Sequence, residues 1–337
     1  NGANMVEYWH WHSIHNAIES YWKGVLSHDL APNRTYHECS VIGNEWLRIG
    51  DKLKNLKKTN SVAVIADTAS LSALVEFPTQ TNGNSSYNII FRWLCDALYE
   101  MNIEYDVIPA DPKQFNRYDY LFLPAYYCAP EGILYALDEY VKNGGNLIAT
   151  FRSCFADEHI KIYHDTQPHI LHEALGIHYD QFTYPQDVSV SFNGKHSAAT
   201  EWMELIHCDS ATALASYEHK VWNEYAAVTE NSYGNGNSLY LGTLFGEDTL
   251  IEILEHFFKK TCYNEKDKYN YECDNKVYIR QGTNDYGKHI VYALNYSDTE
   301  KSFNNISLSA TELISNNTVA PDQHITLQPW DLAILEY

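Results

Sequence analysis

Short apolar runs alternate with amphipathic helices over the middle of this chain. The helices are expected at Ile89–Met101 and at Glu131–Asn143, and the second of them stops before Gly144-Gly145. The apolar runs are 61–66, 105–109, 118–124 and 146–151. A run that is apolar along its whole length needs cover on both faces, which is the condition of a strand in a parallel sheet. The pattern therefore predicts an α/β fold of the doubly wound kind.

A further strand at 238–242 and a helix at 248–260 close this α/β domain, which we place at residues 59–263. Inside it, the stretch 76–88 is polar and contains Gly and Pro. Such a composition is typical of a long, mobile surface loop.

One strand, one loop and one helix precede the α/β domain. Residues 3–12 are predicted to form a strand whose end is crowded with aromatic and imidazole groups, as at the ligand face of a barrel strand. Residues 35–56 have the apolar spacing of a helix. A single β/α unit cannot close a core by itself, so we expect residues 1–58 to be the end of a larger domain. The first residues resemble neither a signal peptide nor a transit peptide.

Residues 264–337 have a different pattern. A polar, charged linker covers 263–275, and short alternating runs separated by turn residues follow it. The runs are 276–280, 289–294, 306–309, 324–327 and 332–335. They predict a small antiparallel β-sandwich.

Composition restricts the partners of the chain. Its formal net charge of -21 repels phosphate backbones and anionic lipids, and no apolar run reaches the roughly 18 residues of a membrane span. We therefore expect no nucleic acid and no membrane among its partners. The seven cysteines are odd in number and scattered, with no C-x-x-C pair. We therefore expect reduced thiols, a reducing compartment and no metal site.

Two stretches carry a family resemblance. Residues 8–24, YWHWHSIHNAIESYWKG, followed by His28-Asp29 and by RTYHE at 34–38, resemble the last barrel strand and loop of glycoside hydrolase family 42 beta-galactosidases. The stretch 118–151, with LPA at 123–125 and GGNLIATF at 144–151, resembles the middle domain of that family. The resemblance covers nearly the whole chain and is weakest after Lys276.

The resemblance implies a three-part protein. Its parts are a (β/α)8 barrel with the active site, a glutamine-amidotransferase-like α/β domain that builds a homotrimer, and a small β domain. Members of the family hydrolyse terminal beta-D-galactosides with retention, using two glutamates. Both glutamates lie upstream of the last barrel strand, so we assign no catalytic residue to this chain. The resemblance further implies no cofactor and a cytoplasmic location. The 27 tyrosines suit a surface that meets a neighbouring subunit.

The resemblance implies that some residues of this chain bind the sugar. Glu19 matches a loop carboxylate that grips galactose hydroxyls, and an ionised acceptor makes the stronger hydrogen bonds. Trp22 stands where many members have a His, and it offers an apolar ring face with one N–H donor. His10 and His12 are further substrate-binding candidates. Without a sugar role, Glu19 would be a solvated loop carboxylate, and the histidines would be barrel packing.

Three alternative functions compete with this one. In the first alternative, Glu7 and Glu19 are the two catalytic carboxylates of a glycosidase. Nothing in the sequence fixes the distance between their carboxyl groups. A cysteine-dependent amidotransferase would use Cys128 or Cys154, yet neither has the small neighbours of a nucleophile elbow. A non-catalytic assembly or carbohydrate-binding module would need only the surfaces of the chain.

Overall fold

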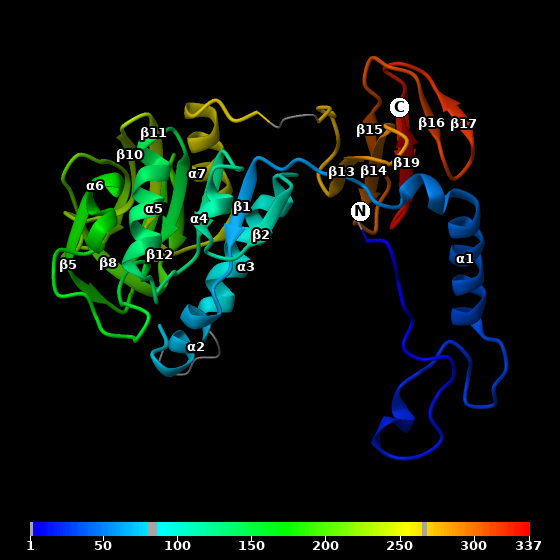
Figure 1. Ribbon diagram of the computed structural model, residues 1–337, viewed down its shortest axis with the longest axis horizontal. Coiled ribbons are helices and arrows are strands. Elements are labelled where there is room, and N and C mark those ends of the chain that lie inside the picture. The colour runs from blue at the N-terminus through cyan, green and yellow to red at the C-terminus, as the bar shows by residue number, and fades with distance from the viewer. Residues whose placement is uncertain (1–2, 80–85, 265–267) are drawn as a thin grey trace. The chain divides into compact units, whose positions relative to one another are not determined.

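The computed structural model describes residues 3–79, 86–264 and 268–337, and it divides into two compact units (Figure 1). One unit, called here the α/β unit, is Asn60–Lys266. The other joins the two ends of the chain, Asn1–Thr59 and Asp267–Tyr337, and is called the terminal unit. In the described residues, no helix combines the length and the apolar character of a bilayer span.

A parallel sheet forms the centre of the α/β unit. Its strands lie in the order β2-β1-β3-β4-β11, and every neighbouring pair in this block is parallel. The strands are β1 (Val62–Ile65), β2 (Tyr105–Ile108), β3 (Tyr120–Leu123), β4 (Asn146–Thr150) and β11 (Gly236–Leu241). All five apolar runs predicted for this unit are therefore strands. β1, β3 and β4 are buried along their whole length, which explains why they contain almost no polar side chain.

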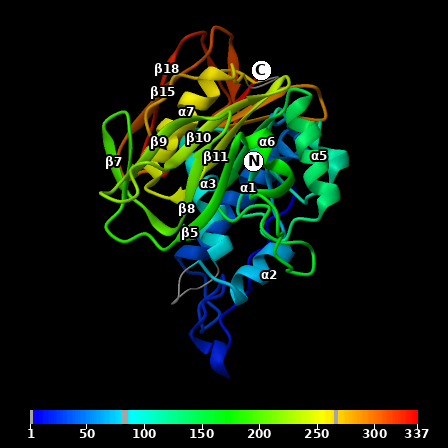
Figure 2. The same cartoon turned by 90° about the vertical axis from the view of Figure 1, so that its left-hand side faces the viewer.

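Helices cover this sheet on both faces. On one face, α3 and α7 pack their apolar sides against side chains such as Val64, Phe122 and Ile148. On the other face, α5 packs against Ile65, Leu121 and Ala149. Figure 2 shows α5 and α7 on opposite sides of the strands. The helices are α2 (Thr68–Glu76), α3 (Ser86–Glu100), α4 (Pro112–Phe115), α5 (Glu131–Lys142), α6 (His172–Leu175), α7 (Glu247–Lys260) and the 3-10 turn η2 (His169–Leu171). A mixed α/β domain with a parallel sheet is thus confirmed.

The sheet continues into an antiparallel extension that the sequence did not reveal. β10 pairs antiparallel with β11, and β9, β6 and β7 follow it, while β8 pairs with β10, β5 and β12. The strands are β5 (Ile177–Thr183), β6 (Ser189–Phe192), β7 (Lys195–Ala198), β8 (Thr200–Cys208), β9 (Thr212–Glu218), β10 (Ala226–Tyr233) and β12 (Thr243–Leu244). Many of their residues are polar, so a search for apolar runs passes over them.

The loop expected over 76–88 falls partly outside the described residues, at 80–85. The expectation is wrong for residue 76, which ends α2, and for residues 86–88, which begin α3. The helix before the loop, α2, was also missed. The Asp67 side chain caps α2 by accepting a hydrogen bond from the Ser70 N–H at 2.6 Å, which is a local start signal for a helix. Of the linker expected at 263–275, residues 265–267 likewise lie outside the described residues.

In the terminal unit, the strand expected over 3–12 is not formed. A single isolated bridge joins His12 to Leu26, and no ladder of the described strands includes this segment. A strand needs hydrogen-bonded neighbours, and one bridge does not supply them. The helix expected at 35–56 is present as α1 (Arg34–Leu53), with the Asn33 side chain as its N-cap.

The C-terminal part folds into a five-stranded antiparallel sheet, β13-β14-β19-β16-β17, and a two-stranded sheet, β15-β18. The strands are β13 (Val277–Thr283), β14 (His289–Asn295), β15 (Lys301–Asn304), β16 (Ala310–Glu312), β17 (Asn317–Val319), β18 (His324–Leu327) and β19 (Leu332–Glu336). The small antiparallel sheet is confirmed, but the strand expected at 306–309 is wrong. This segment is the turn region between β15 and β16, where the Asn305 side chain donates to the Leu308 carbonyl.

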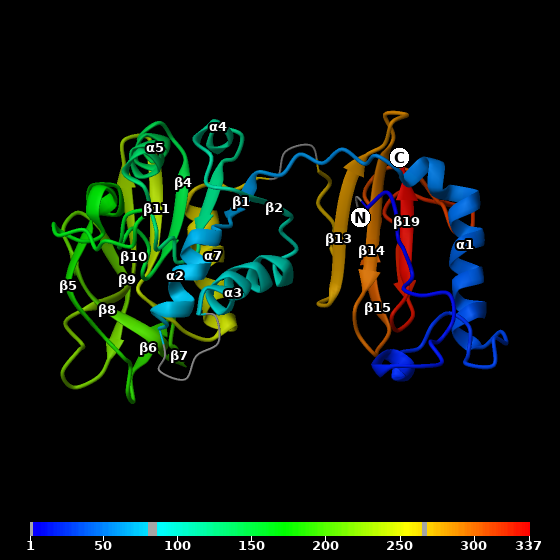
Figure 3. The same ribbon diagram turned by 60° about the horizontal axis from the view of Figure 1, so that its bottom comes forward.

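Helix α1 packs on this C-terminal sheet. Ile49 and Leu53 lie against Ile290, Tyr292 and Ile334, while alternate residues of the same strands face β15 and β18. Figure 3 shows α1 beside β14 and β19. The terminal unit is therefore one body in which a helix, a five-stranded sheet and a two-stranded sheet form three layers.

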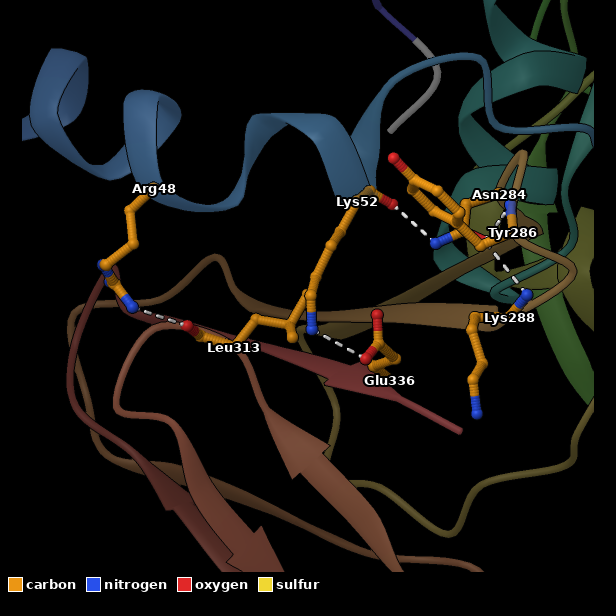
Figure 4. A network of polar contacts seen from close by, with 7 residues as sticks. All are labelled: Arg48, Lys52, Asn284, Tyr286, Lys288, Leu313 and Glu336. Carbon is orange, nitrogen blue, oxygen red and sulfur yellow. Dashed lines mark hydrogen bonds and ion pairs between the residues drawn. The ribbon is translucent and has the colours of Figure 1, made fainter.

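Polar contacts hold the same interface (Figure 4). The Arg48 guanidinium donates to the Leu313 and Ile314 carbonyls at 2.9 and 2.8 Å. Lys52 Nζ lies 2.8 Å from Glu336 Oε1, and the Asn284 side chain donates to the Lys52 carbonyl at 2.9 Å. These bonds tie α1 to the turn between β16 and β17, to the end of β19 and to the turn that follows β13.

We expect Leu53→Ala to destabilise the terminal unit by about 2 to 5 kcal/mol, because it leaves a cavity between α1 and the sheet. Leu53 is 4% exposed. Hydrogen exchange of the α1 and β14 amides measures this local free energy of unfolding.

Leu47→Ala is the matched control, because Leu47 lies on the same helix and is 88% exposed. It should change the free energy of unfolding by less than about 0.5 kcal/mol. Equal effects of the two substitutions would contradict the packing of α1 on the sheet.

Candidate functional site

Residues 10–26 form a loop whose base is pinned by backbone hydrogen bonds. The Val25 N–H donates to the His10 carbonyl at 2.9 Å, and the Leu26 N–H donates to the Trp11 carbonyl at 2.8 Å. A Cβ at Gly24 would lie only 2.3 Å from the His12 backbone, so the close approach of the two segments requires glycine. The residues between them, 14–23, are called the 14–23 loop.

Glu19 and Trp22 lie at the tip of the 14–23 loop. Glu19 belongs to the 3-10 turn η1 (Ile18–Tyr21), and the Trp22 N–H donates to the Glu19 carbonyl at 2.9 Å. The Glu19 side chain is half-buried, and no described residue donates a hydrogen bond to its carboxylate. Trp22 is 59% exposed. Both side chains are therefore free to contact a ligand.

His10 and His12 lie at the base of the loop, away from these two residues. His10 Nε2 is buried and has no hydrogen-bond partner in the part of the chain that the structure describes. The His12 ring is exposed, and its Nδ1 lies 2.9 Å from the Ser13 carbonyl. Within the described residues, no hydrogen bond or ring contact joins either histidine to Glu19 or Trp22. The structure thus brings together Glu19 and Trp22, but it does not bring the four candidates into one pocket.

An apolar hollow lies beside the loop base. Residues 4–8 and α1 enclose about 540 Å³, lined largely by Met5, Val6, Ile42 and Trp46. Met5 and Trp46 are 77% and 40% exposed. Side chains of this kind are normally covered in a folded protein, so this face of the terminal unit fits a packing surface better than a polar ligand.

Metal binding has no support in the described residues, because no group of three or more His, Cys, Asp or Glu side chains is placed to hold an ion. The nearest arrangement is a row of imidazoles. His15 lies 5.9 Å from His12 and 6.1 Å from His28, measured between ring centroids.

In the α/β unit, the two cysteines at the carboxyl ends of the parallel strands are unsuited to catalysis. Cys128 and Cys154 are both buried. Burial raises the pKa of the Cys128 thiol to about 11, and burial raises that of Cys154 further. The thiolate is the nucleophile, so a raised pKa removes the reactive form. The stacked rings of Tyr127 and Phe155 also crowd these loops.

A buried carboxyl group that the sequence did not reveal lies in the antiparallel extension. Glu204, on β8, accepts hydrogen bonds from the Arg152 backbone N–H at 2.8 Å and from the Tyr240 hydroxyl at 2.7 Å. Burial raises the pKa of Glu204 to about 7. Polar and apolar residues do not alternate regularly along 200–208, so the sequence offered no signal that Glu204 is buried.

Apolar side chains, among them Tyr87, Cys128 and Phe151, fill the carboxyl ends of the parallel strands in the α/β unit. Residues 60–262 match the family described as "Beta-galactosidase trimerisation domain". The chain therefore belongs to the glycoside hydrolase family 42 beta-galactosidases, whose trimerisation domain it contains.

Curated relatives extend this similarity beyond the trimerisation domain. The chain is 25% identical to beta-galactosidase LacZ of Lactobacillus acidophilus over 99% of its own length and 49% of the relative's length. It is 28% identical to beta-galactosidase BgaB of Geobacillus sp., over 89% of this chain and 44% of the relative. The chain thus spans about half the length of the curated relatives it matches.

Solved structures show the same fold. Gan42B, a GH42 beta-galactosidase from G. stearothermophilus, superposes with a TM-score of 0.88 at 20% identity, covering 98% of this chain and 48% of that one. A beta-galactosidase from Bacillus circulans sp. alkalophilus gives a TM-score of 0.87 at 21% identity, covering 97% and 49%.

We expect the stability of the α/β unit to depend on pH through Glu204. The folded-state pKa of about 7 lies above the ordinary 4.5, so the folded chain holds this proton more tightly than the unfolded chain. The resulting stabilisation is complete below pH 4.5 and is lost as pH rises through 7. A rise from 4.5 to about 7 corresponds to about 3 kcal/mol.

Glu204→Gln keeps an acceptor for the Arg152 N–H but cannot ionise. Its free energy of unfolding, relative to that of the wild type, should therefore rise by about 3 kcal/mol between pH 4 and pH 8 in urea titrations. The exposed Glu158→Gln is the control and should follow the wild type. A difference that stays constant across this pH range would show that Glu204 does not titrate in the folded chain.

Proposed function

We propose that this chain is the C-terminal part of a retaining beta-galactosidase that hydrolyses terminal beta-D-galactosides. The observation that carries the proposal is the similarity to beta-galactosidases over 99% of the chain, which extends well beyond the trimerisation domain. Both catalytic glutamates then belong to barrel residues outside these 337. The chain contributes sugar contacts and the assembly domain.

In this proposal residues 1–58 are the last strand, loop and helix of a (β/α)8 barrel. The exposed Met5, Val6 and Trp46 support it, since a β/α unit leaves such apolar side chains open when its neighbours are absent. The missing strand pairing of residues 3–12 has the same explanation. Residues 59–263 are the doubly wound, amidotransferase-like assembly domain, and residues 264–337 are the C-terminal β domain.

Sugar recognition rests on the 14–23 loop. Glu19 accepts hydrogen bonds from galactose hydroxyls, and its uncommitted carboxylate supports this role. Trp22 offers a ring face for the apolar side of the sugar, as its exposure allows. His10, whose buried Nε2 has no hydrogen-bond partner among the described residues, and His12 are further substrate-binding candidates at the base of the loop. The protein works as a cytoplasmic homotrimer that needs no metal or other cofactor.

We expect Glu19→Gln, made in the full-length protein that contains these residues, to lower kcat/KM for a beta-D-galactoside. The loss of charge-assisted hydrogen bonds worth about 1.5 to 3 kcal/mol corresponds to a decrease of roughly 10- to 150-fold. Steady-state hydrolysis measures it, and an unchanged thermal midpoint excludes misfolding.

Glu7→Gln is the matched control, because Glu7 is an exposed carboxylate on the segment leading into the loop. It should leave kcat/KM unchanged. Full activity of Glu19→Gln would remove Glu19 from the sugar site. Loss of hydrolysis in Glu7→Gln would instead revive a Glu7–Glu19 pair.

A further inference from the structure

Arg152 is the centre of an aromatic cluster at the carboxyl edge of the α/β unit. It follows β4, and its side chain is almost wholly buried. Its guanidinium carbon lies 4.5 Å from the ring centroid of Trp202 and 4.7 Å from that of Tyr127. The guanidinium also donates to the Phe77 carbonyl at 3.0 Å. The cation thus ties together three segments of the chain.

The cluster continues outward to the surface. The Phe182 ring stacks on Trp202, with ring centroids 4.5 Å apart and planes 26° apart. Phe155 meets Phe182 edge to face at 5.7 Å. Phe182 and Phe77 remain 43% and 49% exposed. We call Phe77, Tyr127, Arg152, Phe155, Phe182 and Trp202 together the Arg152 patch.

The composition of the Arg152 patch is that of an interface core. Aromatic residues and arginine are enriched in the buried centre of protein interfaces, and charged residues other than arginine are depleted there. The patch has five aromatic rings around one arginine, and none of its six side chains is acidic. Stacking holds these rings in fixed orientations, so little side-chain entropy is lost when a partner covers them.

We propose that the Arg152 patch is the surface on which a second copy of this chain docks. The inference rests on the proposed function and deepens it, because it assigns the assembly of the matched trimerisation domain to particular residues. Two chains of net charge -21 repel each other, and contact through aromatic rings and one arginine adds least to that repulsion.

The symmetry of a closed trimer determines which surface of the next copy the Arg152 patch contacts. A threefold assembly uses head-to-tail contacts, so the Arg152 patch of one copy lies against a different surface of the next. The partner surface therefore has to supply apolar groups for Phe77 and Phe182. Substituting the patch alone is enough to break every contact in the ring.

The test is sedimentation, at micromolar concentration, of the full-length protein that contains these residues, comparing wild type, Phe182→Asp and Phe77→Asp. The matched control is Tyr135→Asp, because Tyr135 is an aromatic residue on α5 and is 59% exposed. We expect wild type and control at three times the mass of one full-length subunit. Each patch variant should weaken association about 30-fold or more. Far-UV circular dichroism and the thermal midpoint check that the variants fold.

Each outcome decides one question. Folded patch variants that assemble like the wild type overturn the patch and leave the proposed trimer standing. A wild type that is monomeric overturns both. Patch variants that assemble normally but lose retention on immobilised galactose would assign the patch to sugar instead, which also overturns the proposal.

Discussion

The burial of β1, β3 and β4 on both faces is the constraint on which the α/β unit depends. Because α3 and α7 cover one face and α5 the other, only the strand ends can carry chemistry. In most open parallel sheets, ligands bind in the crevice at the carboxyl ends. Here an apolar cluster that includes Tyr87, Cys128 and Phe151 fills that place. What remains accessible is the outer rim around Arg152, which suits contact with a protein surface.

The same argument explains what could be predicted from the sequence. Wholly buried parallel strands must be apolar throughout, so β1, β3 and β4 are visible as runs. The antiparallel extension buries polar side chains whose hydrogen-bond partners are distant in sequence. The Glu204 carboxyl group, for example, accepts hydrogen bonds from the Arg152 N–H and the Tyr240 hydroxyl. No local pattern reports such a pairing. For residues 3–12 the prediction was wrong in the other direction. Their composition suits a strand, but the neighbouring segments do not form a sheet with them.

The candidate site was only partly predictable. The resemblance of residues 8–24 pointed to Glu19 and Trp22, and the structure places them on one turn. The sequence could not show that Gly24 pins the loop base, or that the C-terminal sheet holds α1 through Arg48 and Lys52. Through α1, the sheet braces the segment from which the 14–23 loop projects. The proposed sugar contacts and the C-terminal domain are thus mechanically linked within one unit.

The central claim is that these residues belong to a larger hydrolase whose active site they complete. The most direct test is the intact mass of the freshly translated gene product, together with its beta-galactosidase activity. The account predicts a mass above 38.8 kDa by a barrel of roughly 250 residues, and hydrolysis by that same species. A product of 38.8 kDa, or a larger one that leaves beta-D-galactosides intact, would contradict it.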